Sequence, residues 1–315
     1  MYLLGFDIGG TKCAVNTALW DGESITLLKK EVHPTDLGVS AEEMIERLMD
    51  TADRIIDRKP DSIGISCGGP LDSESGVILG PPNLPGWDRV EIKRIISEHY
   101  GVEAHLENDA NACAGAEWKF GAGKGKKNMI FLTFGTGLGA GLIIDGRLYR
   151  GTNGNAGEVG HIRLCDDGPV GYGKRGSFEG FCSGGGIGRL AYDMAIKEAD
   201  EGRCPSYYRP GMSADEVSAR SVADAARAGD PTAKEVYRIS GSYLGKGLAV
   251  LIDVLNPELV VIGSVYARSS DLLAEAMKAE LEREALTFSL GVCDIAPAGL
   301  GEAVGDYAAI AAALL

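Results

Sequence analysis

Two segments of the sequence, 128 positions apart, share one pattern of strand, glycine-rich turn and strand. The first is Tyr2–Asp21, with its turn at Gly9-Gly10-Thr11-Lys12, and the second is Met129–Asp145, with its turn at Gly135-Thr136-Gly137-Leu138-Gly139. Short apolar runs joined by glycine turns predict β-hairpins. Because the two turns correspond at a constant offset, we predict a distant internal duplication and two related halves.

The rest of the chain alternates between strand and helix patterns, which predicts an α/β layered fold. At 315 residues the chain is long enough for two domains. Helices are expected over Thr35–Arg58 after a cap at Ser40, and over Glu91–Tyr100, Asp109–Phe120, Ser270–Glu284 and Glu302–Leu315. Strands are expected over Ser62–Ser66, Glu103–Leu106 and Leu259–Ile262, and loops over Cys165–Phe181 and Glu201–Met212.

Composition argues against several classes of partner. The net charge is −14, so we expect no binding to nucleic acid or to a membrane surface through bulk charge. The seven cysteines include no C-x-x-C pair, which predicts free thiols in a reducing cytoplasm. No basic leader precedes the first apolar stretch, and polar residues interrupt the longest one, Leu248–Ile262. We therefore expect a cytoplasmic protein with neither signal peptide nor transmembrane helix.

The two glycine turns predict a site for the phosphates of ATP. Glycines expose successive backbone N–H groups without a Cβ in the way, and such a nest binds phosphate oxygens. Thr11 and Thr136 add hydroxyl groups, Lys12 adds positive charge, and Asp7 is suited to hold Mg²⁺ directly or through water. A single turn of this kind is usually only a hairpin turn, but two equivalent turns with a threonine each favour ATP binding. The backbone groups involved belong to Gly9, Gly10 and Gly137.

Two other phosphate-binding patterns fail. Gly168–Lys174 fits part of a Walker A loop, but Arg175 stands where that loop requires Ser or Thr. Gly135-x-Gly137-x-x-Ala140 fits a dinucleotide fingerprint, but an apolar strand follows it where that fold needs a helix.

Four motifs in order carry a resemblance to a known family. They are Asp7-Ile-Gly-Gly-Thr11-Lys12, Glu107-Asn108-Asp109-Ala-Asn111, Gly135-Thr136-Gly137-Leu-Gly139 and Gly157-Glu158-Val-Gly160-His161. Over essentially its whole length the chain resembles the ROK family of sugar kinases and sugar-responsive repressors, within the actin-like ATPase superfamily. The resemblance implies a two-domain, actin-like (ribonuclease-H-like) fold whose last helix returns to the N-terminal domain. We therefore predict an N-terminal domain of residues 1–118 plus 301–315, and a C-terminal domain of residues 119–300.

Asp109 is the predicted catalytic residue. Phosphoryl transfer to a sugar needs a group that accepts the proton of the attacking hydroxyl, and a carboxylate suffices. The resemblance implies the same role. The alternative is a helix N-cap, since Asp109 precedes an alanine-rich helix pattern, and the two roles are compatible. Asn108 offers a donor and an acceptor to a neighbouring sugar hydroxyl.

The remaining ligand contacts follow from the resemblance. The family pattern arranges Glu158, His161 and Glu179 around the sugar. Asn83 matches a family segment that lines the same pocket, although a proline turn anchored by Trp87 explains this segment nearly as well. We also assign Gly263, directly after the strand at 259–262, to the ATP site.

One family feature is missing. Members commonly carry C-x-C-G-x-x-G-C-x-E, whose three cysteines bind a structural zinc together with the histidine equivalent to His161. This chain has Val170, Tyr172 and Ser177 at the cysteine positions. One histidine cannot build a four-coordinate zinc site, so we predict no zinc. His161 then serves the sugar alone, and the loop is expected to be held by packing around Tyr172 and Phe178.

The predicted function is ATP-dependent phosphorylation of the 6-hydroxyl of a hexose. Glucose is the expected substrate, and N-acetylmannosamine or another N-acylhexosamine is the alternative. A sugar-sensing repressor is the alternative of a different class, but such relatives carry a winged-helix segment for which we expect no room before Asp7. A non-catalytic sugar-binding protein would not need both Asp7 and Asp109. The resemblance also implies a homodimer or homotetramer.

Overall fold

The computed structural model describes residues 1–315 and divides into two compact units. Unit 1 comprises Met1–Lys127, Gly141–Ala156 and Gly299–Leu315, and unit 2 comprises Asn128–Ala140 and Gly157–Ala298. Residues 119–127 and 141–156, which the sequence analysis assigns to the C-terminal domain, pack within unit 1. The predicted domains, residues 1–118 plus 301–315 and residues 119–300, therefore remain a prediction.

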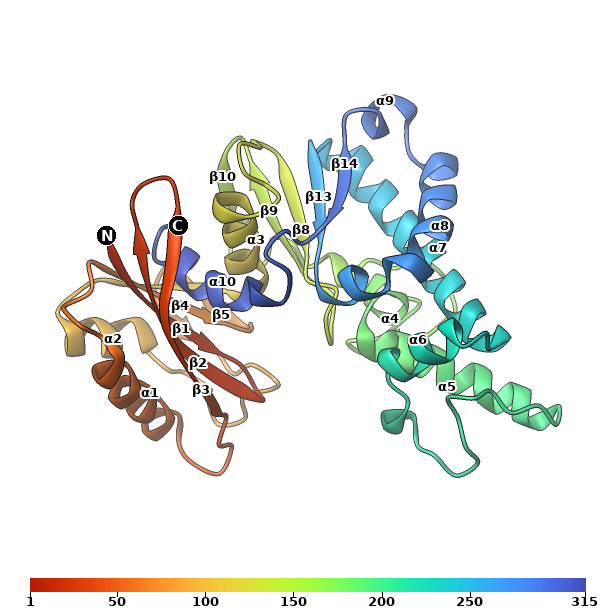
Figure 1. The fold of residues 1–315 in the computed structure, drawn as a ribbon, viewed down its shortest axis with the longest axis horizontal. Helices are drawn as coiled ribbons and strands as arrows, with labels where there is room; N and C mark the ends of the chain where they lie inside the picture. The colour runs from red at the N-terminus through yellow and green to blue at the C-terminus, as the bar shows by residue number, and fades with distance from the viewer. The chain divides into compact units, whose positions relative to one another are not determined.

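The sheet of unit 1 has five strands in the order β3-β2-β1-β4-β7; Figure 1 labels the first four of these, β3, β2, β1 and β4. They are β1 (Tyr2–Ile8), β2 (Lys12–Trp20), β3 (Ile25–Pro34), β4 (Ser62–Cys67) and β7 (Ala104–Asn108). β1 pairs antiparallel with β2 and parallel with β4, while β2–β3 is antiparallel and β4–β7 parallel. The sequence analysis did not predict β3, because its exposed charged side chains, typical of an edge strand, obscure the apolar alternation.

Helices cover both faces of this sheet. The helices α1 (Ala41–Ile55) and α2 (Ile92–Tyr100) contribute to one apolar core with the strands, and α10 (Val304–Ala312) packs against β1, β4 and α3 (Asp109–Phe120). The predicted cap of α1 is confirmed, since Ser40 Oγ accepts the Glu43 N–H at 3.2 Å. On the α10 side, a Cβ at Gly64 would lie 2.0 Å from the Ala309 carbonyl oxygen. Close approach of α10 to the sheet therefore requires glycine in β4.

A second five-stranded sheet has the order β10-β9-β8-β13-β14. Its strands are β8 (Met129–Leu132), β9 (Ala140–Ile144), β10 (Arg147–Tyr149), β13 (Leu259–Ile262) and β14 (Asp294–Pro297). β13 is parallel to β8 and β14, and β9 is antiparallel to β10. Counted along the chain, this strand order repeats that of the first sheet, as an internal duplication requires.

Long helices make up most of the remainder of unit 2 (Figure 1). They are α5 (Gly184–Asp200), α6 (Ala219–Arg227), α7 (Pro231–Leu255) and α8 (Ser264–Glu284), with the short α4 (Phe178–Phe181) and α9 (Thr287–Leu290). α8 begins before the predicted Ser270 and changes direction at the non-helical Ser269. The α7 glycines Gly241 and Gly245 pack directly on α8 backbone, where a Cβ would lie 2.6 Å and 2.5 Å from carbonyl oxygens.

The short elements are two hairpins and three 3₁₀ helices. The hairpins are β5 (Leu71–Asp72) with β6 (Val77–Ile78), and β11 (Val170–Gly171) with β12 (Lys174–Arg175). The 3₁₀ helices are η1 (Val159–His161), η2 (Ala214–Glu216) and η3 (Gly301–Ala303). Thus the predicted loop at 165–181 contains a hairpin and α4. None of the helices combines the length and the apolar character needed to cross a bilayer.

Candidate functional site

The first glycine turn joins β1 to β2 in unit 1. The Gly9 N–H donates to the Lys12 carbonyl at 3.1 Å, and Thr35 Oγ1 donates to the Gly9 carbonyl at 2.5 Å. A Cβ at Gly10 would lie 2.4 Å from the Asn83 carbonyl oxygen, so only glycine fits there. The structure therefore brings the predicted residue Asn83 against the predicted phosphate turn.

Asp7 lies at the end of β1, beside this turn. Burial, with the nearby carboxylates of Asp109 and Asp306, raises the pKa of Asp7 from 3.8 to about 7, although Lys12 and Lys30 oppose the shift. A negative charge at Asp7 is therefore costly unless a cation lies nearby. Mg²⁺ takes carboxylate oxygens as ligands and is commonly held by one or two carboxylates plus substrate phosphates. The donor set at Asp7 fits that kind of site.

Asn108 and Asp109 lie where β7 passes into α3. Asn108 is the N-cap of α3, because its Oδ1 accepts the Ala110 and Asn111 N–H groups at 3.0 and 3.4 Å. The cap role suggested for Asp109 is therefore wrong: Asp109 is the first helical residue, and its Oδ1 accepts the Ala110 N–H at 2.8 Å. The Asp109 side chain is exposed. Since capping engages Asn108 Oδ1, the side-chain NH₂ group of Asn108 is the part suited to bind a ligand.

Three predicted residues of unit 1 face a glycine pair that follows β4. A Cβ at Gly68 would lie 3.8 Å from Asp109 Oδ2 and 3.8 Å from the side-chain amide of Asn83, and a Cβ at Gly69 would lie 3.4 Å from Asn108 Nδ2. The missing side chains leave space where these polar groups converge. The sequence analysis assigned no role to this pair, although Gly-Gly-Pro directly after a buried strand was the available signal.

The second glycine turn joins β8 to β9 and borders a pocket of about 520 Å³ in unit 2. The N–H groups of Gly184 and Gly185, at the start of α5, donate to the carbonyls of Gly135 and Thr136 at 2.7 and 3.3 Å. Gly263 is the N-cap of α8, and its N–H donates to the Leu132 carbonyl at 2.9 Å. Gly263 therefore positions the next two residues, Ser264 and Val265, which line the pocket.

The pocket combines positive charge with apolar wall. Its lining includes one carboxylate, Asp215, and three guanidinium groups, those of Arg189, Arg220 and Arg268. Val217 and Val265 supply apolar surface. This lining suits a ligand that carries both negative charge and apolar surface. The sequence analysis missed the arginines, because they come from three separate helices and no local motif links them.

Glu179 lies on α4 beside the second glycine turn. Its Oε2 accepts the Leu138 N–H at 3.0 Å, and a Cβ at Gly137 would lie 2.9 Å from the same oxygen. A Cβ at Gly160 would lie 3.3 Å from Glu179 Cβ. The structure therefore brings Glu179 against η1, and the exposed side chains of Glu158 and His161 flank the buried residues of η1.

The loop at the zinc-site position is held by packing of Phe178, as predicted, but not by packing of Tyr172. Phe178 is fully buried against α7, where a Cβ at Gly247 would lie 2.2 Å from its ring. Ser177 Oγ accepts the Gly180 N–H at 3.1 Å. The packing role predicted for Tyr172 is wrong, because its side chain is 74% exposed at the tip of the β11–β12 hairpin.

The two cysteines near this loop have other surroundings. Cys182 is buried, with its Sγ 3.5 Å from the Ser240 carbonyl, and a hydrogen bond with Tyr243 lowers the pKa of the Cys165 thiol. The structure contains no group of three or more His, Cys, Asp or Glu side chains able to hold a metal ion. The lack of zinc in the protein remains a prediction.

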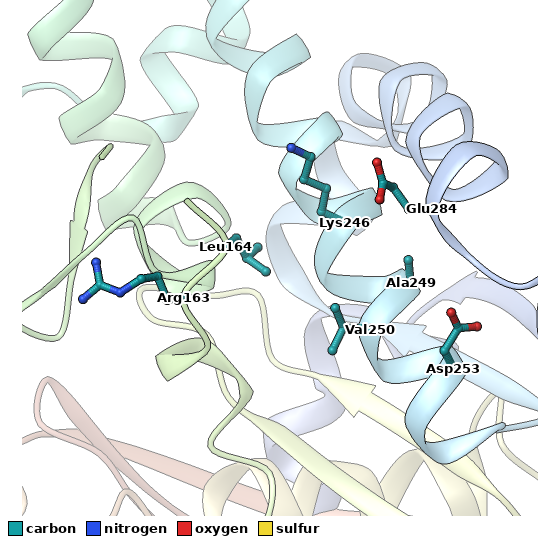
Figure 2. Close-up of a pocket in the computed structure, with 7 residues that line it drawn as sticks. All are labelled: Arg163, Leu164, Lys246, Ala249, Val250, Asp253 and Glu284. Atoms are coloured by element: carbon teal, nitrogen blue, oxygen red, sulfur yellow. The ribbon is translucent and has the colours of Figure 1, made fainter. Parts of the chain in front are cut away.

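A second pocket of unit 2, of about 370 Å³, lies between Arg163–Leu164 and α7 (Figure 2). Its charged groups already have protein partners. Arg163 donates to the Arg175 carbonyl at 2.9 Å, Lys246 lies 3.7 Å from Glu280, and Asp253 accepts the Leu286 N–H at 3.0 Å. No predicted site residue lines this pocket, so it is not the candidate site.

Comparison with known proteins matches nearly the whole chain to one family. The family model described as "ROK family" matches residues 3–314. The chain is 30% identical to a glucokinase of Thermotoga maritima over 305 residues, which cover 96% of this chain and 94% of the relative. It is 29% identical over 283 residues to a xylose repressor of Caldicellulosiruptor bescii, covering 88% of this chain and 69% of the repressor.

A solved structure extends the comparison to three dimensions. The ROK family glucokinase of Streptomyces griseus, in complex with glucose and AMPPNP, matches with a TM-score of 0.78 and 30% identity. The match covers 99% of this chain and 98% of that one. The predicted α/β fold of the actin-like ATPase type is thereby confirmed.

Proposed function

Since the chain belongs to the ROK family, we propose that it is a sugar kinase that transfers the γ-phosphoryl group of ATP to the 6-hydroxyl of a hexose. Glucose is the substrate we expect, by similarity to the two glucokinases. The observation that carries the proposal lies within unit 1. Asp109, Asn83 and Asn108 converge on the Gly68–Gly69 turn, and the charge of Asp109 acts on Asp7 beside the phosphate turn.

In this proposal Asp109 is the general base. Its Oδ1 is oriented by the Ala110 N–H, and Oδ2 is the oxygen near Gly68. Oδ2 accepts the proton of the sugar 6-hydroxyl. At the same time the oxygen of this hydroxyl bonds to the γ-phosphorus, and the bond between the γ-phosphorus and the bridging oxygen of ADP breaks. The Asn108 and Asn83 amides hold the sugar in place through hydroxyl groups next to the reacting one.

The phosphates of ATP are bound by the glycine turns. Thr11, Lys12 and the backbone of Gly9 and Gly10 serve in unit 1, and Thr136 and Gly137 serve in unit 2. Asp7 would hold Mg²⁺, directly or through water, and the ion would supply positive charge to neutralise the phosphates. The arginine-lined pocket of unit 2 suits the rest of the nucleotide, because its valines offer an apolar surface to the base.

Sugar specificity is assigned to Glu158, His161 and Glu179. Carboxylate oxygens accept hydrogen bonds from sugar hydroxyls, and the imidazole both donates and accepts. An N-acylhexosamine such as N-acetylmannosamine is the alternative substrate. A non-catalytic sugar-sensing regulator is the second candidate function, because a xylose repressor shares 29% identity with the chain.

We also propose that the protein assembles as a homodimer or homotetramer. Large apolar side chains are exposed near the end of α7 and around α9, namely Val254, Leu286, Phe288 and Val292. Exposed apolar residues that cluster in this way commonly mark surfaces that are covered in an assembly.

The test is a coupled kinase assay with ATP, Mg²⁺ and a panel of glucose, mannose, N-acetylglucosamine and N-acetylmannosamine, compared by relative kcat/KM. Asp109→Asn should lose at least about 100-fold in kcat, while sugar binding changes little. Its thermal stability should hold, because Asn108 rather than Asp109 caps α3.

Asp50→Asn, an exposed change on α1, is the matched control and should keep full activity. Near-full turnover by Asp109→Asn would show that Asp109 is not the base. Sugar binding by the wild-type protein without phosphorylation of any hexose would favour the regulator.

A further inference from the structure

The carboxylate of Glu107, two positions before the proposed base Asp109, is buried. Glu107 lies near the end of β7, and its side chain is 2% exposed. Its Oε1 accepts the Asn108 N–H and the Asn111 side-chain amide, both at 3.0 Å, and lies 3.4 Å from Ser73 Oγ. Two of these donors belong to residues on either side of Asp109. One carboxylate thus fixes the first turn of α3 from both ends.

The other oxygen of Glu107 is bound by an arginine from a distant part of unit 1. Arg150 Nε and Nη2 each lie 2.7 Å from Glu107 Oε2. Arg150 directly follows β10, and its carbonyl accepts the Ala156 N–H at 3.0 Å. The ion pair therefore ties the 150–156 segment to the corner where β7 passes into α3.

Stability alone does not account for this pair. Taking the Glu107 carboxylate out of water costs free energy that its attraction to Arg150, whose side chain stays 38% exposed, only partly returns. Ion pairs of this kind can often be replaced by neutral groups without loss. A general base, in contrast, must be held within a fraction of an ångström of the attacking hydroxyl. The hydrogen bonds of Glu107 act on the residues that set the direction of the Asp109 side chain.

We propose that Glu107 and Arg150 are positioning residues for Asp109: their ion pair holds the corner between β7 and α3 so that the carboxylate of Asp109 is aimed at the attacking hydroxyl. This inference rests on the proposed kinase function. Removal of Arg150 should therefore lower kcat while the KM for the sugar changes little, because Asn83, Glu158, His161 and Glu179 remain.

The experiment compares Arg150→Met, Arg150→Lys and the double variant Glu107→Gln/Arg150→Met with the wild-type enzyme. Each is measured for kcat, sugar KM and urea unfolding. Arg94→Met is the control, because Arg94 is also an ion-paired arginine of unit 1, but its partners Glu91 and Glu98 lie on the exposed face of α2. We expect Arg150→Met to lose about 10- to 100-fold in kcat with less than about threefold change in KM. Arg150→Lys should recover part of the rate, and Arg94→Met should match wild type.

The double variant separates positioning from stability. It removes both charges, so it should regain much of the stability that Arg150→Met loses, since no unpaired buried carboxylate remains. Its kcat should stay low. Recovery of kcat together with stability, or an unchanged kcat in Arg150→Met, would overturn the proposal.

Hydrogen exchange provides a readout that does not need kinase activity. Arg150→Met should speed amide exchange in residues 107–111 and 150–156 relative to Arg94→Met. If the wild-type protein phosphorylates no hexose, the kinase proposal fails, and the exchange result still decides whether this ion pair holds the corner. Unchanged exchange in both segments would refute it.

Discussion

Replacing Asp7 by asparagine should stabilise the metal-free protein while abolishing its activity. Burial and two neighbouring carboxylates raise the pKa of Asp7 from 3.8 to about 7. The raised pKa means that ionising Asp7 is harder in the folded chain than in the unfolded chain. The contribution of Asp7 to stability is therefore greatest below pH 4 and is lost as the pH rises towards 7. Asparagine has nearly the shape of the protonated side chain and does not ionise.

The size of the effect follows from the shift. About three pKa units at about 1.4 kcal/mol each set an upper limit of about 4 kcal/mol. Asp7 is partly exposed, and solvent screening reduces this to about 2 kcal/mol at pH 8. At pH 5 Asp7 is protonated in the folded protein but ionised in most unfolded chains. The free-energy difference between wild type and variant then depends only on the difference between pH 5 and the pKa of Asp7 in the unfolded chain. The gain in Asp7→Asn should then be below about 1 kcal/mol.

The assay is urea unfolding of wild type and Asp7→Asn in EDTA at pH 5 and pH 8, with Asp50→Asn as control. Added Mg²⁺ should stabilise wild type at pH 8 but not Asp7→Asn, because a bound cation offsets the charge that the variant lacks. The reasoning is refuted if Asp7→Asn is no more stable than wild type at pH 8, or if its advantage is the same at both pH values.

One further substitution and one metal measurement test other parts of the structure. Glu117 is fully buried, and its carboxylate accepts the N–H groups of Ala122, Gly299 and Leu300 at 2.8, 3.0 and 2.9 Å. Glu117→Gln should therefore lower the free energy of unfolding in urea by about 2–4 kcal/mol. A variant as stable as wild type would contradict this role. Metal analysis of the purified protein should find no stoichiometric zinc, and chelation should leave the far-ultraviolet circular dichroism unchanged. About one zinc per chain would instead indicate that Cys165 or another nearby cysteine binds metal.

Local patterns in the sequence were enough to predict much of the fold. The bounds of α3 and β13 agree with the structure, as does the Ser40 cap, because each depends on residues within a few positions of one another. The constant offset between the two glycine turns also predicted two related halves, and the two sheets have the same strand order. The motifs could identify Asp7 and Asp109 as candidates because the family resemblance is carried by short runs of residues.

The tertiary structure decided which side chains contact one another and how buried and how charged each one is. The charge of Asp306, near the end of the sequence, raises the pKa of Asp7, and Arg150 binds Glu107 although 43 positions separate them. The polar side chains around the Gly68–Gly69 turn come together only when β4, β7 and the segment around Asn83 are assembled. No local spacing encodes these contacts. Burial and charge depend on all the neighbours of a group in space. The same is true of Tyr172, whose aromatic side chain suggested packing but lies 74% exposed at a hairpin tip, with the His161 ring edge-on to it at 6.3 Å between centroids.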